Sequence, residues 1–416
     1  MESTVVYLKD RCLLSDVPKA VASKLSSARL LTTSGKKVCY CGLITVGNLT
    51  CVFLPRQTET SCSVSVKRNF SPALFKALRL YSQQSDRLNT SDDEGENLEG
   101  SEQLSLAYDL LSDYRMNGLY SRRDIHRKTN EGKPNWPRTV AKHQPYLSPS
   151  GPIYMDYEGS KSRNRTDSEA SRIHAYLIQN LDVTYGEAFF GNTSFRDGGL
   201  TKPSTISKRY FLAILNGELQ KLYSERDMKI FRMLIKLVKK VWGNTTTSRF
   251  IGTKSFHTIW EHMLKKVISG TINLNDKFSI PTYTNAQGKR FPAAQKGQRT
   301  DIIIHKEESN TFAIIDAKYY EATSLTTSPG WPDLVKQFFY AKAVESLYGS
   351  ATIKNFFIFP GTESHFQSVL MADRKDESKT DEQYQEIDCV YINPSEVIEA
   401  YVTGGVLTDL SERLIT

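Results

Sequence analysis

The sequence feature that most constrains the fold is residues 297–320, which have the pattern of a β-hairpin. Asp301 precedes three consecutive isoleucines, a polar turn follows, and residues 312–319 are rich in β-branched and aromatic side chains. Side chains alternate between the two faces of a strand, so Asp316 and Lys318 lie on the same face. The pattern therefore predicts an acid and an amine at the end of one strand, beside the acid that begins its neighbour.

These residue types indicate a particular chemistry. A carboxylate in an apolar environment is costly unless a positive charge compensates it. Two carboxylates, Asp301 and Asp316, with the carbonyl of Ala317, form an oxygen-rich site suited to Mg²⁺, with Mn²⁺ as a substitute. Such an ion polarises a phosphoryl oxygen and generates a hydroxide nucleophile. Lys318 would orient the attacking water or offset developing negative charge.

This arrangement resembles the core of the PD-(D/E)xK nucleases, with Thr300 at the position of that superfamily's usual proline. The short tripeptide is not specific by itself, because it also occurs at Asp227, Glu131, Asp373 and Glu377. Only the copy at Asp316 ends a long apolar strand that follows a strand headed by aspartate. The alternative is an ordinary hairpin with a surface Asp–Lys pair.

Two helices flank the hairpin, at residues 256–269 and 334–348, and the resemblance implies accessory site residues on both. Glu261 would join the metal site from the preceding helix. Gln337 and Tyr340 share a face of the following helix and resemble an auxiliary motif of RecB-like nucleases, in which the usual spacing is four. They would bind DNA phosphate or orient Lys318. In each case a plain helix-surface residue is the alternative.

The order of predicted elements from residue 246 onward is helix, hairpin, helix, strand, strand, helix. It predicts a mixed sheet flanked by helices, so we expect an α/β fold with a nuclease domain at 246–416. Residues 1–85 read as a small β-rich module with a short helix at 75–81. Residues 86–104 read as an acidic linker, and residues 105–245 as a basic, largely helical middle region.

The middle region contains a basic stretch interleaved with aromatic residues, and residues 153–157 are expected to form a strand after it. This mixture suits a surface that follows a nucleic-acid backbone, and the net charge of +8 agrees with it. The alternative is a solvated protein face. The candidate DNA-binding residues are Arg122, Arg123, Arg127, Lys128 and Arg138, with Tyr340 from the later helix.

Other classes of protein are disfavoured. The sequence has no apolar run long enough to span a membrane and no signal-peptide pattern, so we expect a cytoplasmic protein with reduced cysteines. None of the six cysteines forms a zinc half-site. No G-x-x-x-x-G-K-[ST] loop occurs, so this chain is not expected to hydrolyse nucleotide itself.

Several motifs together resemble the LlaJI-type restriction endonucleases, which are similar in role to McrC. The motifs are residues 135–139, 151–157, 223–227, 260–261, Asp301, residues 316–319 and residues 330–337. The resemblance runs from about residue 130 to the C-terminus. It implies a Mg²⁺-dependent subunit of a bacterial restriction system that cuts double-stranded DNA. It also implies a separate McrB-like AAA+ NTPase, docked by residues 1–85, and DNA methyltransferases of the same system.

Two other functions stay open. A non-catalytic DNA-binding or adaptor subunit would keep a nuclease-like fold, but would not require an intact Asp–Asp–Lys set. A structure-specific nuclease, such as a junction resolvase, would use the same chemistry. The long upstream portion of the chain disfavours it.

Overall fold

The computed structural model describes residues 4–58, 64–88, 98–196, 202–240, 249–294, 297–376, 378–381 and 383–416. Helices and mixed sheets alternate along the chain, which confirms the α/β fold class. The chain forms two compact units. Unit 1 comprises residues 1–104, 187–192 and 246–416, and unit 2 comprises residues 105–186 and 193–245.

The N-terminal part of unit 1 is a four-stranded sheet in the order β1-β3-β2-β9. Its strands are β1 (Thr4–Lys9), β2 (Cys41–Val46), β3 (Leu49–Leu54) and β9 (Arg249–Thr253). β1 is parallel to β3, whereas β2 is antiparallel to both β3 and β9. Gly42 faces Gly252, and a Cβ at Gly42 would lie 2.2 Å from the carbonyl oxygen of Ile251. The close approach explains why glycine stands at this pairing.

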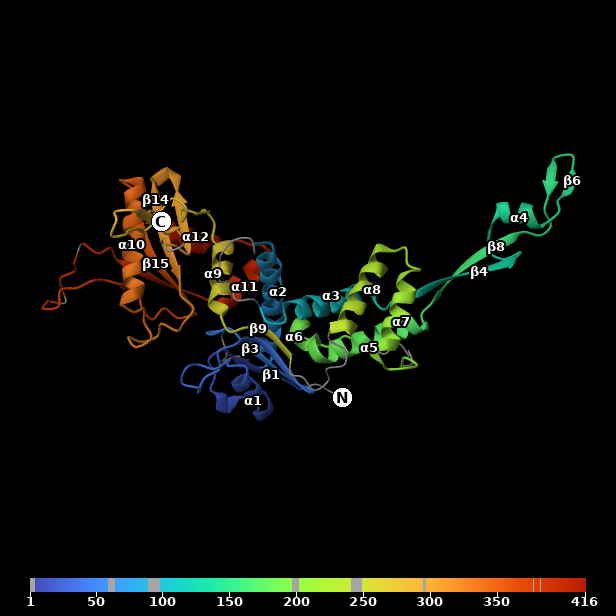
Figure 1. The fold of residues 1–416 in the computed structure, drawn as a ribbon, viewed down its shortest axis with the longest axis horizontal. Helices are drawn as coiled ribbons and strands as arrows, with labels where there is room; N and C mark the ends of the chain where they lie inside the picture. Colours follow the sequence, from blue (N-terminus) through green and yellow to red (C-terminus); the bar gives the residue numbers. More distant parts are fainter. Residues whose placement is uncertain are drawn as a thin grey trace. The chain divides into compact units, whose positions relative to one another are not determined.

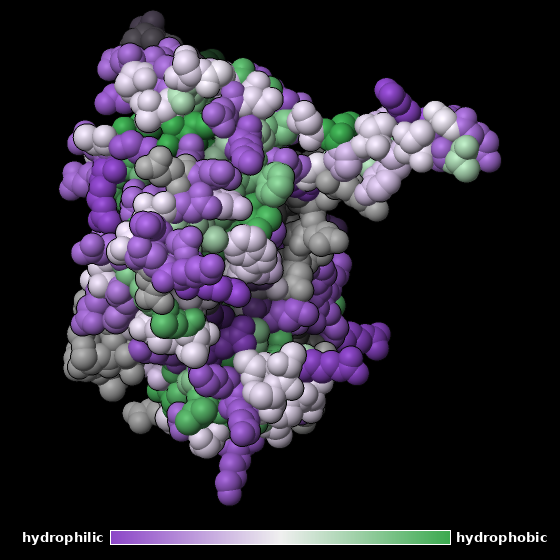
Figure 2. All heavy atoms as spheres, turned by 90° about the vertical axis from the view of Figure 1, so that its left-hand side faces the viewer, coloured by the Kyte–Doolittle hydropathy of each residue, from purple (hydrophilic) through white to green (hydrophobic). Residues whose placement is uncertain are grey.

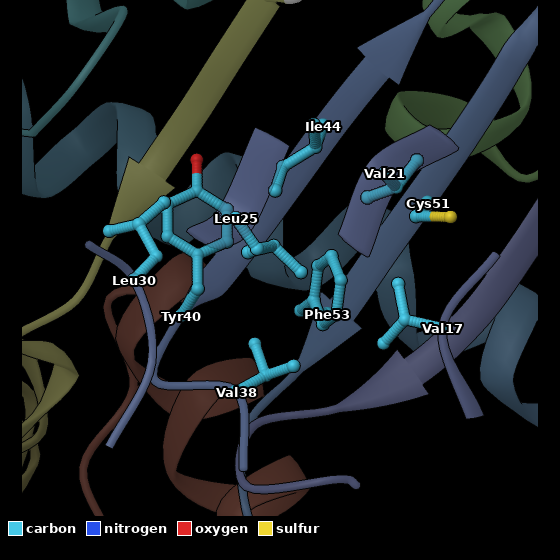
Figure 3. Packing of buried hydrophobic residues seen from close by; sticks show 9 residues of the cluster. All are labelled: Val17, Val21, Leu25, Leu30, Val38, Tyr40, Ile44, Cys51 and Phe53. Carbon is cyan, nitrogen blue, oxygen red and sulfur yellow. The ribbon is translucent and has the colours of Figure 1, made fainter. Parts of the chain in front are cut away.

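A helix closes the core of this module. α1 (Lys19–Ser27) buries Val21 and Leu25 against Ile44, Cys51 and Phe53 of the sheet (Figure 3). α2 (Val64–Leu88) contacts β1 and β3, and packs against α6 (Glu187–Phe190). The short helix expected at 75–81 is thus part of a much longer one. Residues 89–97 of the expected acidic linker lie outside the described residues.

The C-terminal part of unit 1 is a six-stranded mixed sheet in the order β10-β13-β14-β15-β17-β16. β13 and β14 form the predicted antiparallel hairpin, and β14, β15 and β17 run parallel (Figure 1). The strands are β10 (Thr271–Ile272), β13 (Ile302–Lys306), β14 (Thr311–Ala317), β15 (Thr352–Pro360), β16 (Ser368–Val369) and β17 (Ile387–Ile392). A separate ribbon pairs β11 (Thr282–Thr284) with β12 (Arg290–Pro292).

Helices cover this sheet. α10 (Trp331–Tyr348) packs Ala341 and Val344 onto Phe312 and Ile314 of β14. α9 (Phe256–Val267) and α12 (Thr408–Ile415) also contact β14, and α11 (Pro394–Thr403) contacts α9 and α2. Asn393 caps the start of α11, where its side chain accepts a hydrogen bond from the Ser395 amide. α12 was not predicted.

Unit 2 combines helices with a long β-ribbon (Figure 1). Its helices include α3 (Ser101–Asn117), α5 (Glu169–Leu181), α7 (Lys208–Leu219) and α8 (Glu225–Lys240). The ribbon pairs β4 (Arg122–Thr129) with β8 (Glu158–Arg165), joined by β5 (Lys133–Pro134). Along the chain, β5 is followed by α4 (Trp136–Lys142) and then by the hairpin of β6 (Tyr146–Ser148) and β7 (Gly151–Ile153), before β8 begins. The strand expected at 153–157 was wrong, because β7 ends at Ile153.

None of the described helices combines the length and the hydropathy that a membrane crossing requires. On the face drawn in Figure 2, hydrophilic side chains predominate, and apolar side chains form small groups between them.

The four-part division of the sequence stays a prediction. The pairing of β2 with β9 shows that residues before 85 and after 246 share one unit.

Candidate active site

Two predicted acids lie side by side at one end of the β13–β14 hairpin. Ile302 pairs with Ile315, so the register places Asp301 opposite Asp316. The Asp301 Oδ2 atom accepts a hydrogen bond from the Ala317 amide at 2.9 Å. Asp316 is almost completely buried, with 8% exposure. The apolar strands that carry the two acids thus hold them together in a largely water-excluded position.

Lys318 continues β14 and completes the group. Its amide donates to the Ile358 carbonyl at 2.9 Å, which extends the pairing with β15. Its Nζ lies 2.6 Å from Asp316 Oδ2 and donates to Asp333 Oδ1 at 2.6 Å. The ammonium group therefore bridges an acid of the sheet and an acid of the first turn of α10.

Burial and neighbouring charge perturb these groups. Burial raises the pKa of Asp301 to about 8, and the negative charges of Glu261 and Asp316 add to the effect. Burial acts to lower the pKa of Lys318, but the carboxylates of Asp316 and Asp333 outweigh it and leave this pKa above its usual value. Lys318 therefore carries its positive charge at neutral pH.

The accessory residues occupy different positions. Glu261, on α9, is half-buried and acts on Asp301 through its charge. Tyr340, on α10, is half-buried too. Burial raises the pKa of its phenol to about 12, and the charges of Asp301, Asp316 and Glu261 contribute. The structure thus brings both side chains into the electrostatic range of the acid pair, and their catalytic and DNA-binding roles stay predictions.

Gln337 is fully buried under the sheet. Its Nε2 donates to the carbonyls of Ile314 and Phe356, at 2.9 and 3.2 Å, so the amide nitrogen ties α10 to β14 and β15. Its Oε1 has no hydrogen-bond partner among the described residues. The observed contacts are structural, and the accessory role in catalysis stays a prediction.

The contact of Asp333 with Lys318 was not foreseen from the sequence. Asp333 lies in the first turn of α10, where a carboxylate also suits the helix dipole. Tyr320 donates to its Oδ2 at 3.4 Å. The only sequence signal is the Gly330-Trp331-Pro332-Asp333 helix start, which fixes where the helix begins but not what its first turn touches.

The basic candidates belong to unit 2, whereas the acid pair belongs to unit 1. Arg122, Arg123, Arg127 and Lys128 lie on β4, and Arg138 lies on α4. The Arg122 Nε atom is 3.6 Å from Glu218 Oε1, and the Lys128 Nζ atom is 3.2 Å from Glu131 Oε2. Part of this basic character is therefore balanced within unit 2, and DNA binding there stays a prediction.

The residues at the acid pair fit a divalent cation. Asp316 Oδ2 is buried, and the positive charge that lies against it within the described residues is the Lys318 ammonium, whose Nζ is 2.6 Å away. No group of three or more His, Cys, Asp or Glu side chains is placed to hold a metal ion within the described ranges. Two carboxylates and the Ala317 carbonyl would therefore need water or phosphate oxygens as the remaining ligands, which is how Mg²⁺ is commonly bound.

The fold and the site together define a mixed α/β protein that carries two acids and a lysine at adjoining strand ends. The family model of the LlaJI restriction endonucleases matches residues 40–373. The chain therefore belongs to the LlaJI restriction endonuclease family, which confirms the expected relationship.

Similar proteins include a curated relative and two solved assemblies. The "Type II restriction enzyme BsuMI component YdjA" of Bacillus subtilis is 26% identical over 341 residues, covering 78% of this chain and 72% of that protein. A half-complex of Thermococcus gammatolerans McrB AAA+ hexamers with bound McrC aligns with a TM-score of 0.38 at 13% identity, covering 97% and 99% of the two chains. The McrBC complex of the same organism aligns with a TM-score of 0.25 at 13% identity, covering 62% and 85%.

Proposed function

We propose that this chain is the nuclease subunit of a restriction system and hydrolyses phosphodiester bonds of double-stranded DNA at the Asp301–Asp316–Lys318 site. The observation that carries the proposal is the geometry of that group. The acids lie opposite each other on paired strands, and the lysine ammonium lies 2.6 Å from one of them. Membership of a restriction endonuclease family supports the same reading.

Each residue has a distinct part in the proposed reaction. Asp301 and Asp316, with the Ala317 carbonyl, would hold Mg²⁺, or Mn²⁺ in its place. The bound ion supplies a polarised phosphoryl oxygen and an activated water. Lys318 keeps its charge and offsets the negative charge that develops on the phosphorane-like oxygens. Glu261 adds negative potential beside Asp301, and Gln337 holds α10 against the strand that carries Asp316.

We propose further that a separate McrB-like AAA+ NTPase drives this subunit and that methyltransferases of the same system protect the host DNA. The sequence lacks a Walker A loop, so nucleotide hydrolysis would come from another chain. The B. subtilis relative is described as a component of a restriction enzyme, which suits a multi-subunit system.

One observation favours a different function, that of a non-catalytic DNA-binding adaptor. Lys318 is held between two carboxylates, and the described residues contain no three-membered cluster of metal-binding side chains. An adaptor would keep these ion pairs as structural contacts. It would bind DNA without metal and would not nick it with any partner.

The test is a plasmid nicking assay with Mg²⁺, with and without a co-purified partner and GTP or ATP. Wild type is compared with Asp316→Ala and Lys318→Ala. Asp373→Ala is the matched control, because Asp373 begins an Asp-x-Lys tripeptide in an exposed loop far from the acid pair in sequence. We expect cleavage by wild type and the control only. Full activity in Asp316→Ala would remove the proposal, and an absence of nicking in every arm would favour the adaptor.

A further inference from the structure

A cavity of about 890 Å³ lies beside the proposed nuclease site, within unit 1. One wall comes from the N-terminal module, residues 7–12, Thr32, Lys37 and Arg56. The other comes from the segment between β14 and α10, including residues 320–321, residues 326–328 and Asp333. Asp333 lines the cavity and also accepts a hydrogen bond from Lys318, so this residue connects the cavity with the candidate active site.

The cavity lining favours an anion. It contains four basic residues, Lys9, Arg11, Lys37 and Arg56, and three acids, Asp10, Glu321 and Asp333. Two of these acids are paired, one with Arg56 of the same lining and one with Lys318 outside it, so the remaining charge balance is Lys9, Arg11 and Lys37 against Glu321. Asp10 is 2.8 Å from the Arg56 Nε atom, and Asp333 is 2.6 Å from the Lys318 Nζ atom. Thr326, Thr327 and Ser328 line the opposite side, and their hydroxyl groups make hydrogen bonds within their own loop.

Arg11 is the most unusual residue of this lining. Its backbone has a φ of 69°, a left-handed conformation that is uncommon for a residue with a side chain. A hydrogen bond from its amide to the Val38 carbonyl, at 2.9 Å, holds the turn in place. Its Nε atom is buried without a hydrogen-bond partner among the described residues, and lies 3.9 Å from Asp10 Oδ1. Strain of this kind is tolerated where the position of a side chain matters.

Arg56, which lines the cavity, also contacts the residue that follows Lys318. The Arg56 amide donates to the Tyr319 hydroxyl at 2.9 Å, and the Arg56 guanidinium lies 4.8 Å from the centre of the Tyr319 ring. Tyr319 directly follows Lys318. The N-terminal module is therefore bound to the strand end that carries the candidate catalytic group, and the spacing between the two sites is fixed by the fold.

We propose that this cavity is a phosphate-binding subsite for the DNA strand that passes through the nuclease site, with Arg11 and Lys37 as its phosphate ligands. The inference rests on the proposed function and adds a binding role to the N-terminal module. Arg11 and Lys37 contact the sugar–phosphate backbone next to the scissile phosphate. They contribute affinity and alignment without reading the base sequence.

The experiment measures binding of a short fluorescein-labelled DNA duplex to the full chain by fluorescence anisotropy, over a range of salt concentrations. EDTA is present, so binding is read without cleavage. Each phosphate contact contributes about 0.9 to the slope of log K against log salt. We expect Arg11→Gln combined with Lys37→Gln to weaken binding and to reduce that slope by roughly 1.8. Arg11→Lys, which keeps the charge, should retain most of the slope.

Lys36→Gln combined with Lys19→Gln is the matched control, because both lysines are exposed in the same module and neither lines the cavity. It should leave the slope within error of wild type, and thermal unfolding should show that all variants fold. An unchanged slope in the Arg11–Lys37 variant overturns the inference. The inference is also overturned if ATP or GTP alone raises the thermal unfolding temperature of wild type but not of this variant, while both bind DNA equally.

The binding assay, run beside the plasmid nicking assay with Mg²⁺, separates this inference from the proposed function. Asp316→Ala should keep the wild-type salt slope while losing cleavage with Mg²⁺. If the Arg11–Lys37 variant binds DNA normally and Asp316→Ala loses cleavage, the subsite is rejected and the nuclease assignment stands. If the Arg11–Lys37 variant loses slope and Asp316→Ala still cleaves, the nuclease assignment is rejected instead.

Discussion

The Nζ atom of Lys318 donates a hydrogen bond to Asp333 Oδ1 at 2.6 Å, across 15 residues of chain. The contact joins the end of β14 to the first turn of α10, and the same ammonium group lies 2.6 Å from Asp316 Oδ2. Tyr320 donates to the other oxygen of the same carboxylate. We therefore expect Asp333 to help position the candidate catalytic lysine.

Replacing Asp333 with Asn should slow DNA cleavage by roughly 10- to 100-fold, because a hydrogen bond to a charged group contributes about 1.5–3 kcal/mol. Single-turnover rates of Asp333→Asn, Lys318→Ala and the double variant give the measurement. If Asp333 acts through Lys318, the double variant is no slower than Lys318→Ala. If the double variant is slowed by the product of the two single-variant factors, Asp333 acts by another route.

Arg56→Met should destabilise the protein by about 3–5 kcal/mol, because it leaves the carboxylate of Asp10 buried without its partner. The two side chains are 13% and 5% exposed, and Arg56 Nε lies 2.8 Å from Asp10 Oδ2. Urea unfolding of Arg56→Met and of the double variant with Asp10→Asn provides the measurement. The double variant should recover part of the loss. A cost below about 1 kcal/mol for Arg56→Met, typical of an exposed pair, would contradict this account.

Acid should destabilise unit 2 through His174. Burial lowers the pKa of this histidine to about 4, with a smaller contribution from Arg226. Its Nδ1 accepts a hydrogen bond from the Tyr120 amide at 3.1 Å, which requires the unprotonated nitrogen. Because the folded-state pKa lies below the unfolded value of 6.5, the unfolded chain binds more protons between these values. Stability is therefore complete above about pH 6.5 and falls by up to about 3 kcal/mol as the pH approaches 4.

The measurement is the free energy of urea unfolding against pH for wild type, His174→Gln and the exposed-histidine control His365→Gln. We expect His174→Gln to flatten the dependence between about pH 6.5 and pH 4 relative to wild type, and the control to follow wild type. An equal pH dependence in all three proteins would show that His174 does not titrate on unfolding.

The core of unit 1 was predictable where local patterning decides the structure. Three isoleucines after Asp301 and the apolar run before Lys318 can bury themselves only as paired strands, and the polar turn between them sets the register. Asn393 marks the start of α11 because its side chain satisfies an amide of the first turn. The pairing of Asp301 with Asp316 follows from that register alone.

Long-range relationships were not predictable. The contact of Lys318 with Asp333 depends on how α10 crosses the sheet, and the pairing of β2 with β9 joins residues about 200 positions apart. β4 has the sequence Arg-Arg-Asp-Ile-His-Arg-Lys-Thr and lacks the apolar alternation of a half-buried strand, so it reads as a basic coil. α2 extends far beyond residues 75–81, and it contains Pro72, which argues locally against a continuous helix.

The most direct test of the central claim, that the two acids form a metal-dependent site, is Mn²⁺ binding to the isolated protein, followed by electron paramagnetic resonance. The measurement needs neither a partner subunit nor a recognition sequence. Wild type and Asp373→Ala should bind Mn²⁺ alike and lose it to Mg²⁺ in competition, whereas Asp316→Ala and Asp301→Ala should bind much more weakly. Equal binding by wild type and Asp316→Ala, or no binding by wild type, would contradict the account.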